Sequence, residues 1–108
     1  MPTPLVYESE LYVLNNNGIL GCYDLKTGKE HYYDRIPHRS FGFSASPVGA
    51  DGRIYLAGED GLIFVIKAGK TLNHLATHAI GEPLMATPAI SAGTLYIRGS
   101  RHLFAVGK

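Results

Sequence analysis

The sequence predicts an all-β fold, and three observations carry that prediction. First, the strand-forming residues Ile, Val, Leu, Tyr and Phe gather in short runs between glycine-containing turns. Second, no stretch keeps the 3.6-residue apolar spacing of an amphipathic helix. Third, the chain repeats itself. Segments that start at Pro4, Pro47 and Pro88 each place an apolar residue and then a tyrosine at the same offset, at Leu11–Tyr12, Ile54–Tyr55 and Leu95–Tyr96.

The middle repeat shows the predicted elements in order. Strands are expected at 45–49, 53–57, 62–67 and 71–77, separated by the turns ADGR, GEDG and KAGK. In these turns glycine supplies the positive φ that a tight hairpin needs. The run LIFVI at 62–66 is apolar on both faces, which is typical of a strand packed between two neighbouring sheets.

Four antiparallel strands in a unit of roughly 40 to 45 residues are the signature of a β-propeller blade. We expect repeats at about 4–44, 45–85 and 86–108, and only three strands in the last one. The chain is therefore predicted to be one partial propeller domain, 1–108, that holds about 2.75 four-stranded blades.

Composition and charge exclude several classes of function. Ten Lys and Arg against nine Asp and Glu give a net charge of +1, which offers no case for binding nucleic acid or a membrane surface. The longest apolar run, 62–66, is far shorter than a membrane span, and we expect no signal peptide in the N-terminal MPTPLVYESE. Cys22 is the single cysteine, so an internal disulfide is impossible and the cellular compartment stays open.

The repeats resemble those of the pyrroloquinoline-quinone-like (PQQ-like) β-propeller superfamily over essentially the whole chain. The resemblance rests on SPVGADGRIYLAGEDGLIFVI, TPAISAGTLYIRGSRHLFAVGK and YDLKTGKE. Family repeats usually place a tryptophan after the Thr-Gly turn. This chain has no tryptophan; Tyr32 or Tyr33 stands near that place in the first unit and Leu75 in the second. The resemblance implies the C-terminal repeats of a propeller, in a family whose members are often periplasmic or secreted.

An incomplete propeller is expected to associate. Each end of a three-blade wedge leaves a sheet face on the order of 300 Å² uncovered, and the third strand near 102–106 has an open edge. Two copies give a six-bladed ring, within the usual range, whereas three copies give nine blades. The missing strand comes from the partner's N-terminal segment or stays absent. The alternative is an isolated fragment or another packing.

Candidate binding residues gather at one end of the predicted blades. The turns between first and second strands and between third and fourth strands are short and share one end, which we call the short-turn end. The turns between second and third strands share the other end with the connections between blades, and we call it the loop-rich end. Because function on β scaffolds usually resides in such loops, we expect a partner or ligand to meet Asn16, Asn17, Arg35, His38, Arg39, Glu59, Asp60, Arg101 and His102.

Most of these features also have an ordinary structural explanation, which we favour. Asp51 and Asp60 precede glycine in hairpin turns, where aspartate bonds the local backbone. The segment HYYDRIPHRS is either a partner-binding loop or, preferably, a solvated connection between blades. His74 and His78 would lie about 13 Å apart on a strand, which is too far for one metal ion. The tyrosines at the repeated offset are expected in the core: Tyr12, Tyr55 and Tyr96.

The predicted function is a non-catalytic scaffold or binding module that uses no cofactor. The alternative that the resemblance implies is the remnant of a quinone-dependent dehydrogenase, which needs a quinone site, a Ca²⁺ with oxygen ligands and a catalytic aspartate. The alcohol dehydrogenases of that family also use adjacent cysteines and a tryptophan, and this chain has neither. It has no carboxylate cluster in one loop and no Gly-x-Ser-x-Gly turn for a nucleophile. A kinase-associated sensor propeller rests on family habit alone.

Overall fold

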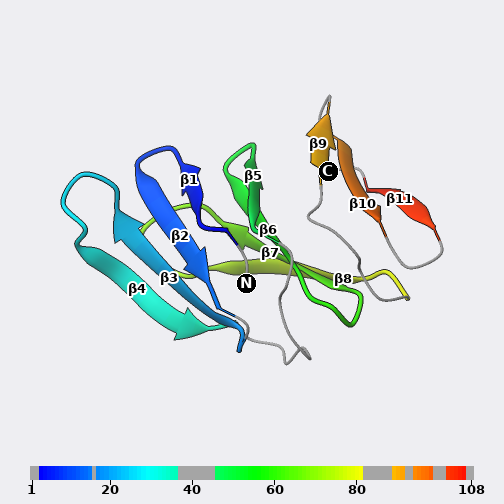
Figure 1. Cartoon of the computed structure of the whole chain (residues 1–108), viewed down its shortest axis with the longest axis horizontal. Helices are drawn as coiled ribbons and strands as arrows, with labels where there is room; N and C mark the ends of the chain where they lie inside the picture. Colours follow the sequence, from blue (N-terminus) through cyan, green and yellow to red (C-terminus); the bar gives the residue numbers. More distant parts are fainter. Residues whose placement is uncertain are drawn as a thin grey trace.

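Eleven strands and no helix make up the described part of this computed structural model, which is residues 3–15, 17–36, 46–81, 89–91, 94–98 and 102–106 (Figure 1). No helix there is long and apolar enough to cross a membrane. The strands are β1 (Leu5–Tyr7), β2 (Glu10–Leu14), β3 (Ile19–Asp24), β4 (Glu30–Arg35), β5 (Val48–Ala50), β6 (Arg53–Ala57), β7 (Leu62–Lys67), β8 (His74–Ala79), β9 (Ala89–Ser91), β10 (Thr94–Arg98) and β11 (Leu103–Val106).

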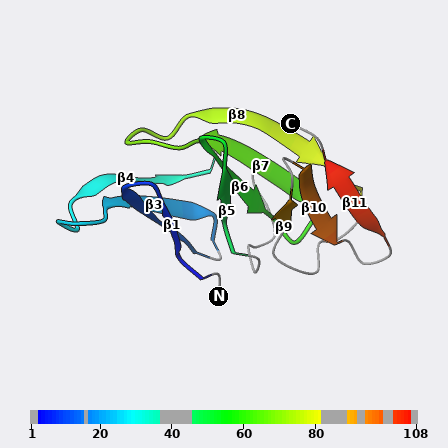
Figure 2. The same ribbon diagram turned by 90° about the horizontal axis from the view of Figure 1, so that it is seen from above.

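The strands form three antiparallel sheets in which neighbours in sequence are neighbours in space. Blade one is β1-β2-β3-β4, blade two is β5-β6-β7-β8, and blade three is β9-β10-β11. The first strands of the blades lie next to one another, with β5 between β1 and β9 (Figure 2). The all-β prediction of partial propeller blades with four, four and three strands is therefore confirmed.

The middle blade shows where the predicted strand limits hold and where they are wrong. β6 and β7 have the predicted bounds, whereas β5 begins at Val48. The fourth strand runs from His74 to Ala79 instead of 71–77. The reason is a wider loop: the Lys67 N–H donates to the Asn73 carbonyl at 2.9 Å, and the ladder shifts by one residue between Val65 and Ile66.

The turn at 51–52 explains one of the two aspartates. Asp51 has a φ of 53° and Gly52 a φ of 75°, and two positive φ values are what a two-residue type I′ hairpin requires. Asparagine and aspartate tolerate this conformation better than other non-glycine residues do. The conformation agrees with the turn role predicted for Asp51.

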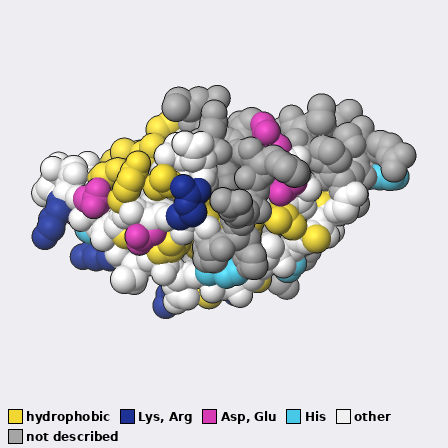
Figure 3. All heavy atoms as spheres, turned by 90° about the horizontal axis from the view of Figure 1, so that it is seen from below, with side chains coloured by type: hydrophobic (Ala, Val, Ile, Leu, Met, Phe, Trp, Pro, Cys, Tyr) yellow, Lys and Arg dark blue, Asp and Glu magenta, His cyan; other side chains and the backbone are white. Residues whose placement is uncertain are grey.

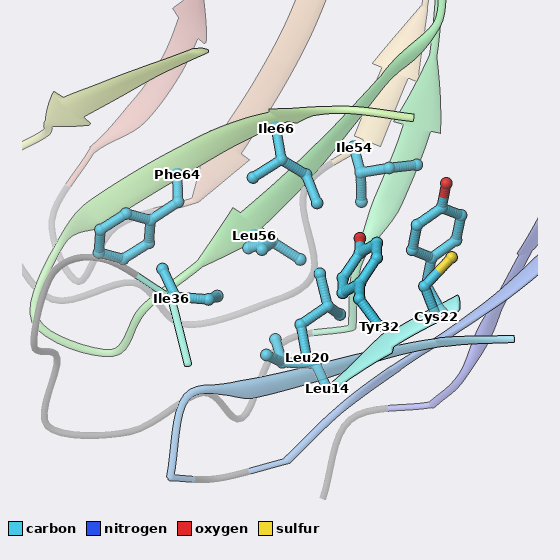
Figure 4. Close-up of a cluster of buried hydrophobic side chains, with 10 residues drawn as sticks. Leu14, Leu20, Cys22, Tyr32, Ile36, Ile54, Leu56, Phe64 and Ile66 are labelled. Carbon is cyan, nitrogen blue, oxygen red and sulfur yellow. The ribbon is translucent and has the colours of Figure 1, made fainter. Parts of the chain in front are cut away.

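The main core fills the interface between blades one and two, which we call the first seam. Alternate side chains of each strand point into it because side chains on a strand change face at every residue. Blade one supplies the lower group in Figure 4 and blade two the upper group, and the buried side chains are Tyr12, Leu14, Leu20, Cys22, Tyr32, Ile36, Ile54, Leu56, Phe64 and Ile66.

A smaller second seam joins blades two and three. Ala57, Ile63 and Leu95 are buried there, with Tyr55, Ile80 and Ile90 packed against them. The same strand positions thus face the next blade in each unit, because Tyr55 occupies in the second seam the place that Tyr12 occupies in the first.

Two tyrosine hydroxyls of blade one hold the turns of blade two. The Gly52 N–H donates to the Tyr7 hydroxyl at 2.7 Å, and the Gly69 N–H donates to the Tyr12 hydroxyl at 2.8 Å. The Cys22 thiol donates to the Gly69 carbonyl at 3.4 Å. These contacts fix blade two against blade one and satisfy backbone groups that the seam covers.

Burial makes the first seam sensitive to alkaline pH. It raises the pKa of Tyr12 to about 12 and the pKa of the Cys22 thiol to about 11, from 10.0 and 9.0. An acid with a raised pKa in the folded state favours folding fully below its unfolded pKa, so this stability is lost as the pH rises from 9 through 12.

Replacing Tyr12 with phenylalanine is expected to remove part of that alkaline loss. At neutral pH, Tyr12→Phe should lower the free energy of unfolding by about 1–3 kcal/mol, because the Gly69 N–H loses its acceptor in a covered place. Urea unfolding at pH 8 and pH 11, at one protein concentration, measures both effects. Tyr33→Phe, on a side chain that is exposed in the single chain, is the control at a concentration where the chain is monomeric. An unchanged pH slope in Tyr12→Phe would contradict the assignment.

Candidate functional site

The predicted division of the turns between two ends is present in the structure. At the loop-rich end, the Ile36 N–H donates to Gly18 and the Ile80 N–H to Gly61, so the turn after the second strand lies beside the exit of the fourth. At the short-turn end, Leu25 and Ala68 donate to Ser9 and Gly52, and this joins the two short turns of each blade. Figure 1 shows the β6–β7 turn on its lower side, where β2 ends and β3 begins.

At the loop-rich end, blade one brings two predicted residues together. Arg35, at the end of β4, donates from Nη1 to the Asn17 carbonyl at 2.7 Å. The turn that carries Asn17 is built by Asn15, whose Oδ1 accepts the N–H groups of Asn17 and Ile19 at 2.9 and 3.1 Å. The Arg35 side chain is therefore held on a rigid turn and remains exposed.

Blade two repeats this turn with Glu59 and Asp60 at its tip. The Gly58 N–H donates to Leu62 at 2.8 Å, as the Asn15 N–H donates to Ile19 at 3.1 Å. Asp60 Oδ1 accepts the Leu62 N–H at 3.4 Å, which is the local backbone contact expected of a turn aspartate, while Glu59 is exposed.

The remaining predicted residues are divided between described and undescribed parts of the chain. His102 is exposed just before β11, at the same end. Four of the predicted residues lie outside the described residues, namely Asn16, His38, Arg39 and Arg101. The structure thus joins Arg35 to Asn17 directly, and it places the Glu59–Asp60 pair in the equivalent turn of blade two and His102 just before β11.

A pocket that the sequence did not indicate lies at the short-turn end, between blade one and the β7–β8 loop. It is open, has a volume of about 540 Å³, and is lined by Glu8, Ser9, Glu10, Asp24, Leu25, Lys26 and Lys70. The Glu-Ser-Glu turn that lines the pocket has the sequence of an ordinary hairpin turn and gives no sign of a pocket. Lys70 comes from the next repeat, and no pattern within one repeat shows that it approaches.

Two of the carboxylates that line this pocket are engaged, Glu10 with a histidine and Asp24 with the backbone. Glu10 Oε2 lies 3.7 Å from His31 Nε2, and each side chain is 10% exposed. The N–H groups of Thr27 and Lys26 donate to Asp24 Oδ1 and hold the pKa of that carboxyl below its usual range. Among the described residues, no group of three His, Cys, Asp or Glu side chains is placed to hold a metal ion.

The outer faces of the first and third blades carry exposed apolar side chains. On blade one, Val6 is 56% and Tyr33 is 53% exposed, and Val13 lies on the same face because it pairs with Gly21, which pairs with Tyr33. Figure 3 shows hydrophobic side chains gathered at the end of the molecule that blade one forms. On blade three, Tyr96 is 39% and Leu103 is 70% exposed. The tyrosine predicted in the core of each repeat is fully buried only in blade one.

Comparison with known proteins finds likeness in structure. No sequence family and no curated protein matches the chain. BamB from Moraxella catarrhalis superposes with a TM-score of 0.73 at 20% identity, over 94% of this chain and 31% of that chain. The computationally designed Ika4 protein superposes with a TM-score of 0.72 at 15% identity, over 96% of this chain and 64% of that chain.

This chain therefore spans under a third of BamB and just under two thirds of Ika4. At such identities the likeness concerns the fold alone. It agrees with the antiparallel strand order of the three sheets. The chain has the fold of partial β-propeller blades.

Proposed function

We propose that this chain is a self-assembling, non-catalytic propeller module that associates with a second copy and binds a partner at its loop-rich end. The observation that carries the proposal is the pair of apolar outer faces on blades one and three, with exposed Val6, Tyr33, Tyr96 and Leu103. Soluble monomers rarely leave contiguous apolar patches of several hundred Å² uncovered. A second copy has both kinds of face and can cover both.

The binding end is proposed from the placement of its charged residues. Arg35 at the end of β4, Glu59 in the β6–β7 turn and His102 just before β11 are all exposed, and Arg35 is held by the Asn17 carbonyl. Loops fixed in this way on a β scaffold commonly carry binding. Charges of both signs suit a protein or a small polar ligand better than a polyanion.

The solution mass tests the self-assembly. We expect light scattering after size exclusion, across micromolar concentrations, to give about twice the chain mass of 11.7 kDa. Dilution should shift the population toward the monomer because association obeys mass action. A species that stays at 11.7 kDa at every concentration would refute the proposal.

A further inference from the structure

The first seam shows how the uncovered outer face of the third blade could be covered by another blade. Tyr12 and Cys22 pair across β2 and β3 and face blade two; Tyr96 and Ala105 pair across β10 and β11. In blade one Leu14 pairs with Leu20, and at the corresponding position of blade three Arg98 pairs with Leu103. The partner of Arg98 is Leu103 because the β10–β11 connection is one residue shorter than the β2–β3 connection. The exposed Tyr96, Leu103 and Ala105 therefore stand at the strand positions that blade one uses to receive blade two.

The opposite side of blade one matches the side of blade two that fills the first seam. Blade two presents Ile54, Leu56 and Phe64 to blade one. In the repeat, Leu11 and Val13 of blade one correspond to Ile54 and Leu56 of blade two, and Val13 is exposed. Blade one therefore carries an unused copy of the docking face, and blade three carries an unused copy of the receiving face.

The geometry points to a head-to-tail ring of two copies. The outer face of blade one in the second copy docks on the outer face of blade three in the first copy, in the same way as blade two docks on blade one within a chain. The second copy's blade three receives the first copy's blade one in turn, so six blades close into a ring with two identical closing seams. This inference rests on the proposed function and specifies which surfaces meet. In one copy, β9 continues the row of first strands β1 and β5, and the partner's β1 comes next.

At each seam, the first strands of the two blades place a large residue opposite a small one, and the closing seam would keep this pattern. A Cβ at Gly49 would lie 2.9 Å from Tyr7 Cγ, so blade two needs a glycine where blade one places a large ring. At the same two repeat positions, the second seam has Ala50 on blade two and Ile90 on blade three. By sequence position, Ser91 of blade three would lie opposite Val6 of the second copy at the closing seam. Each pair joins a smaller residue to a larger one.

The buried area favours a closed ring over a single contact. Blade one offers a four-stranded face of about 300 Å² and blade three a three-stranded face of roughly 225 Å², so a single seam buries roughly 500 Å², which is no larger than a crystal-packing contact. Two seams bury roughly 1,000 Å², the area that a specific interface needs. A face-to-face pair that joins blade one to blade one has a single seam and stays below that area.

The closing seam cannot repeat the hydrogen bond that the Gly69 N–H makes to the Tyr12 hydroxyl in the first seam. Leu25 and Ala68 donate to equivalent carbonyls, so Lys26 of blade one stands where Gly69 stands in blade two. The Lys26 N–H already donates to Asp24 Oδ1 at 2.9 Å, whereas the Gly69 N–H donates to a tyrosine hydroxyl. Tyr96 therefore contributes apolar area at the closing seam, but its hydroxyl accepts no hydrogen bond from the Lys26 N–H.

A disulfide across the closing seam tests the arrangement. Because the Cβ built at Gly49 lies 2.9 Å from Tyr7 Cγ, the two Cβ atoms at these places are separated by no more than about 4.5 Å, within disulfide range. The equivalent places at the closing seam are Val6 and Ser91. Val6→Cys with Ser91→Cys in one chain, in a Cys22→Ala background, should give a covalent dimer of the full chain under mild oxidation.

The single variants decide which faces meet. In a head-to-tail ring, Val6→Cys alone gives no crosslink, and an equal mixture of Val6→Cys and Ser91→Cys chains gives a heterodimer that mass spectrometry identifies. Ala50→Cys with Ile90→Cys should form a disulfide within one chain and calibrates the geometry. Val6→Cys with Leu75→Cys, on a middle-blade residue that is 46% exposed, is the matched negative control.

Two further variants test the hydrogen-bond argument. Tyr96→Phe should leave the dimer dissociation constant within about threefold of that of the original chain, whereas Tyr96→Asp should raise it about 100-fold or more. Tyr96 is partly exposed, so both variants keep the monomer fold, which circular dichroism verifies.

The outcomes separate this inference from the function on which it rests. A dimer in which Val6→Cys crosslinks to itself, or a covalent ladder of trimers and longer chains, overturns the head-to-tail ring but leaves self-assembly standing. A monomer at every concentration refutes both. A covalent dimer from the paired variant, with a heterodimer from the mixture and no product from Val6→Cys alone, establishes the ring.

Discussion

Replacing Phe64 with alanine is expected to lower the free energy of unfolding by about 3–5 kcal/mol. Phe64 is fully buried in β7, at the centre of the first seam, and its ring lies 6.4 Å from the His74 ring, centroid to centroid. Truncation removes a large apolar side chain and leaves a cavity between two sheets that hydrogen bonds hold in place. Urea unfolding followed by circular dichroism, at a fixed protein concentration, measures the change.

Leu75→Ala is the matched control for this substitution. Leu75 lies on the neighbouring strand β8 and is 46% exposed, so its truncation should change the free energy of unfolding by less than about 1 kcal/mol. If Phe64→Ala does not fold, Phe64→Leu should give the same direction with a smaller loss. Equal losses at positions 64 and 75 would show that the first seam is not the main core.

Gly49→Ala is expected to lower the free energy of unfolding by about 1–3 kcal/mol, although it adds only one methyl group. The new Cβ would lie 2.9 Å from Tyr7 Cγ, at the base of a ring that cannot turn away without moving the strand. Displacement of the ring would also pull the Tyr7 hydroxyl from the Gly52 N–H, which it accepts at 2.7 Å. Thermal unfolding of the variant at fixed concentration reports the loss.

Gly21→Ala provides the comparison, because its Cβ also meets a tyrosine ring. There the nearest atoms, at 2.7 Å, are Cε2 and the hydroxyl oxygen of Tyr23, at the far end of a side chain on the outer face. In the monomer this ring can swing toward solvent, so the loss, measured at a concentration where the chain is monomeric, should stay below about 1 kcal/mol. A larger loss at Gly21 than at Gly49 would contradict the account of the first seam.

The sequence predicted the repeat and most strand limits because both depend on local chemistry. β6 and β7 are bounded by Gly-containing turns that stop the strands at fixed residues. β8 was misplaced because Lys70 and Thr71 give no local sign that the chain is still crossing a loop. That loop is set by the bond between the Lys67 N–H and the Asn73 carbonyl, across six residues.

The candidate site was predictable only in its general location. Alternation of turns between two ends follows from antiparallel pairing, and this is enough to place Arg35 near Asn17. Which tyrosine is covered depends on whether another blade follows, so Tyr96 could not be distinguished from Tyr12 by its offset. The pocket beside Glu10 joins two repeats through Lys70, and contacts between repeats have no signature within one repeat.

The strand order has a consequence for how the chain acquires its structure. Every ladder in the described sheets joins strands that follow each other in sequence, with no crossover. Such local pairing closes short loops and generally gives faster folding than long-range pairing does. We infer that each sheet can form before its neighbour is synthesised, and that burial of Tyr12 against blade two follows as a later step. Errors in folding would then arise mainly when finished sheets stack in the wrong order, and the Tyr7–Gly49 fit opposes that error.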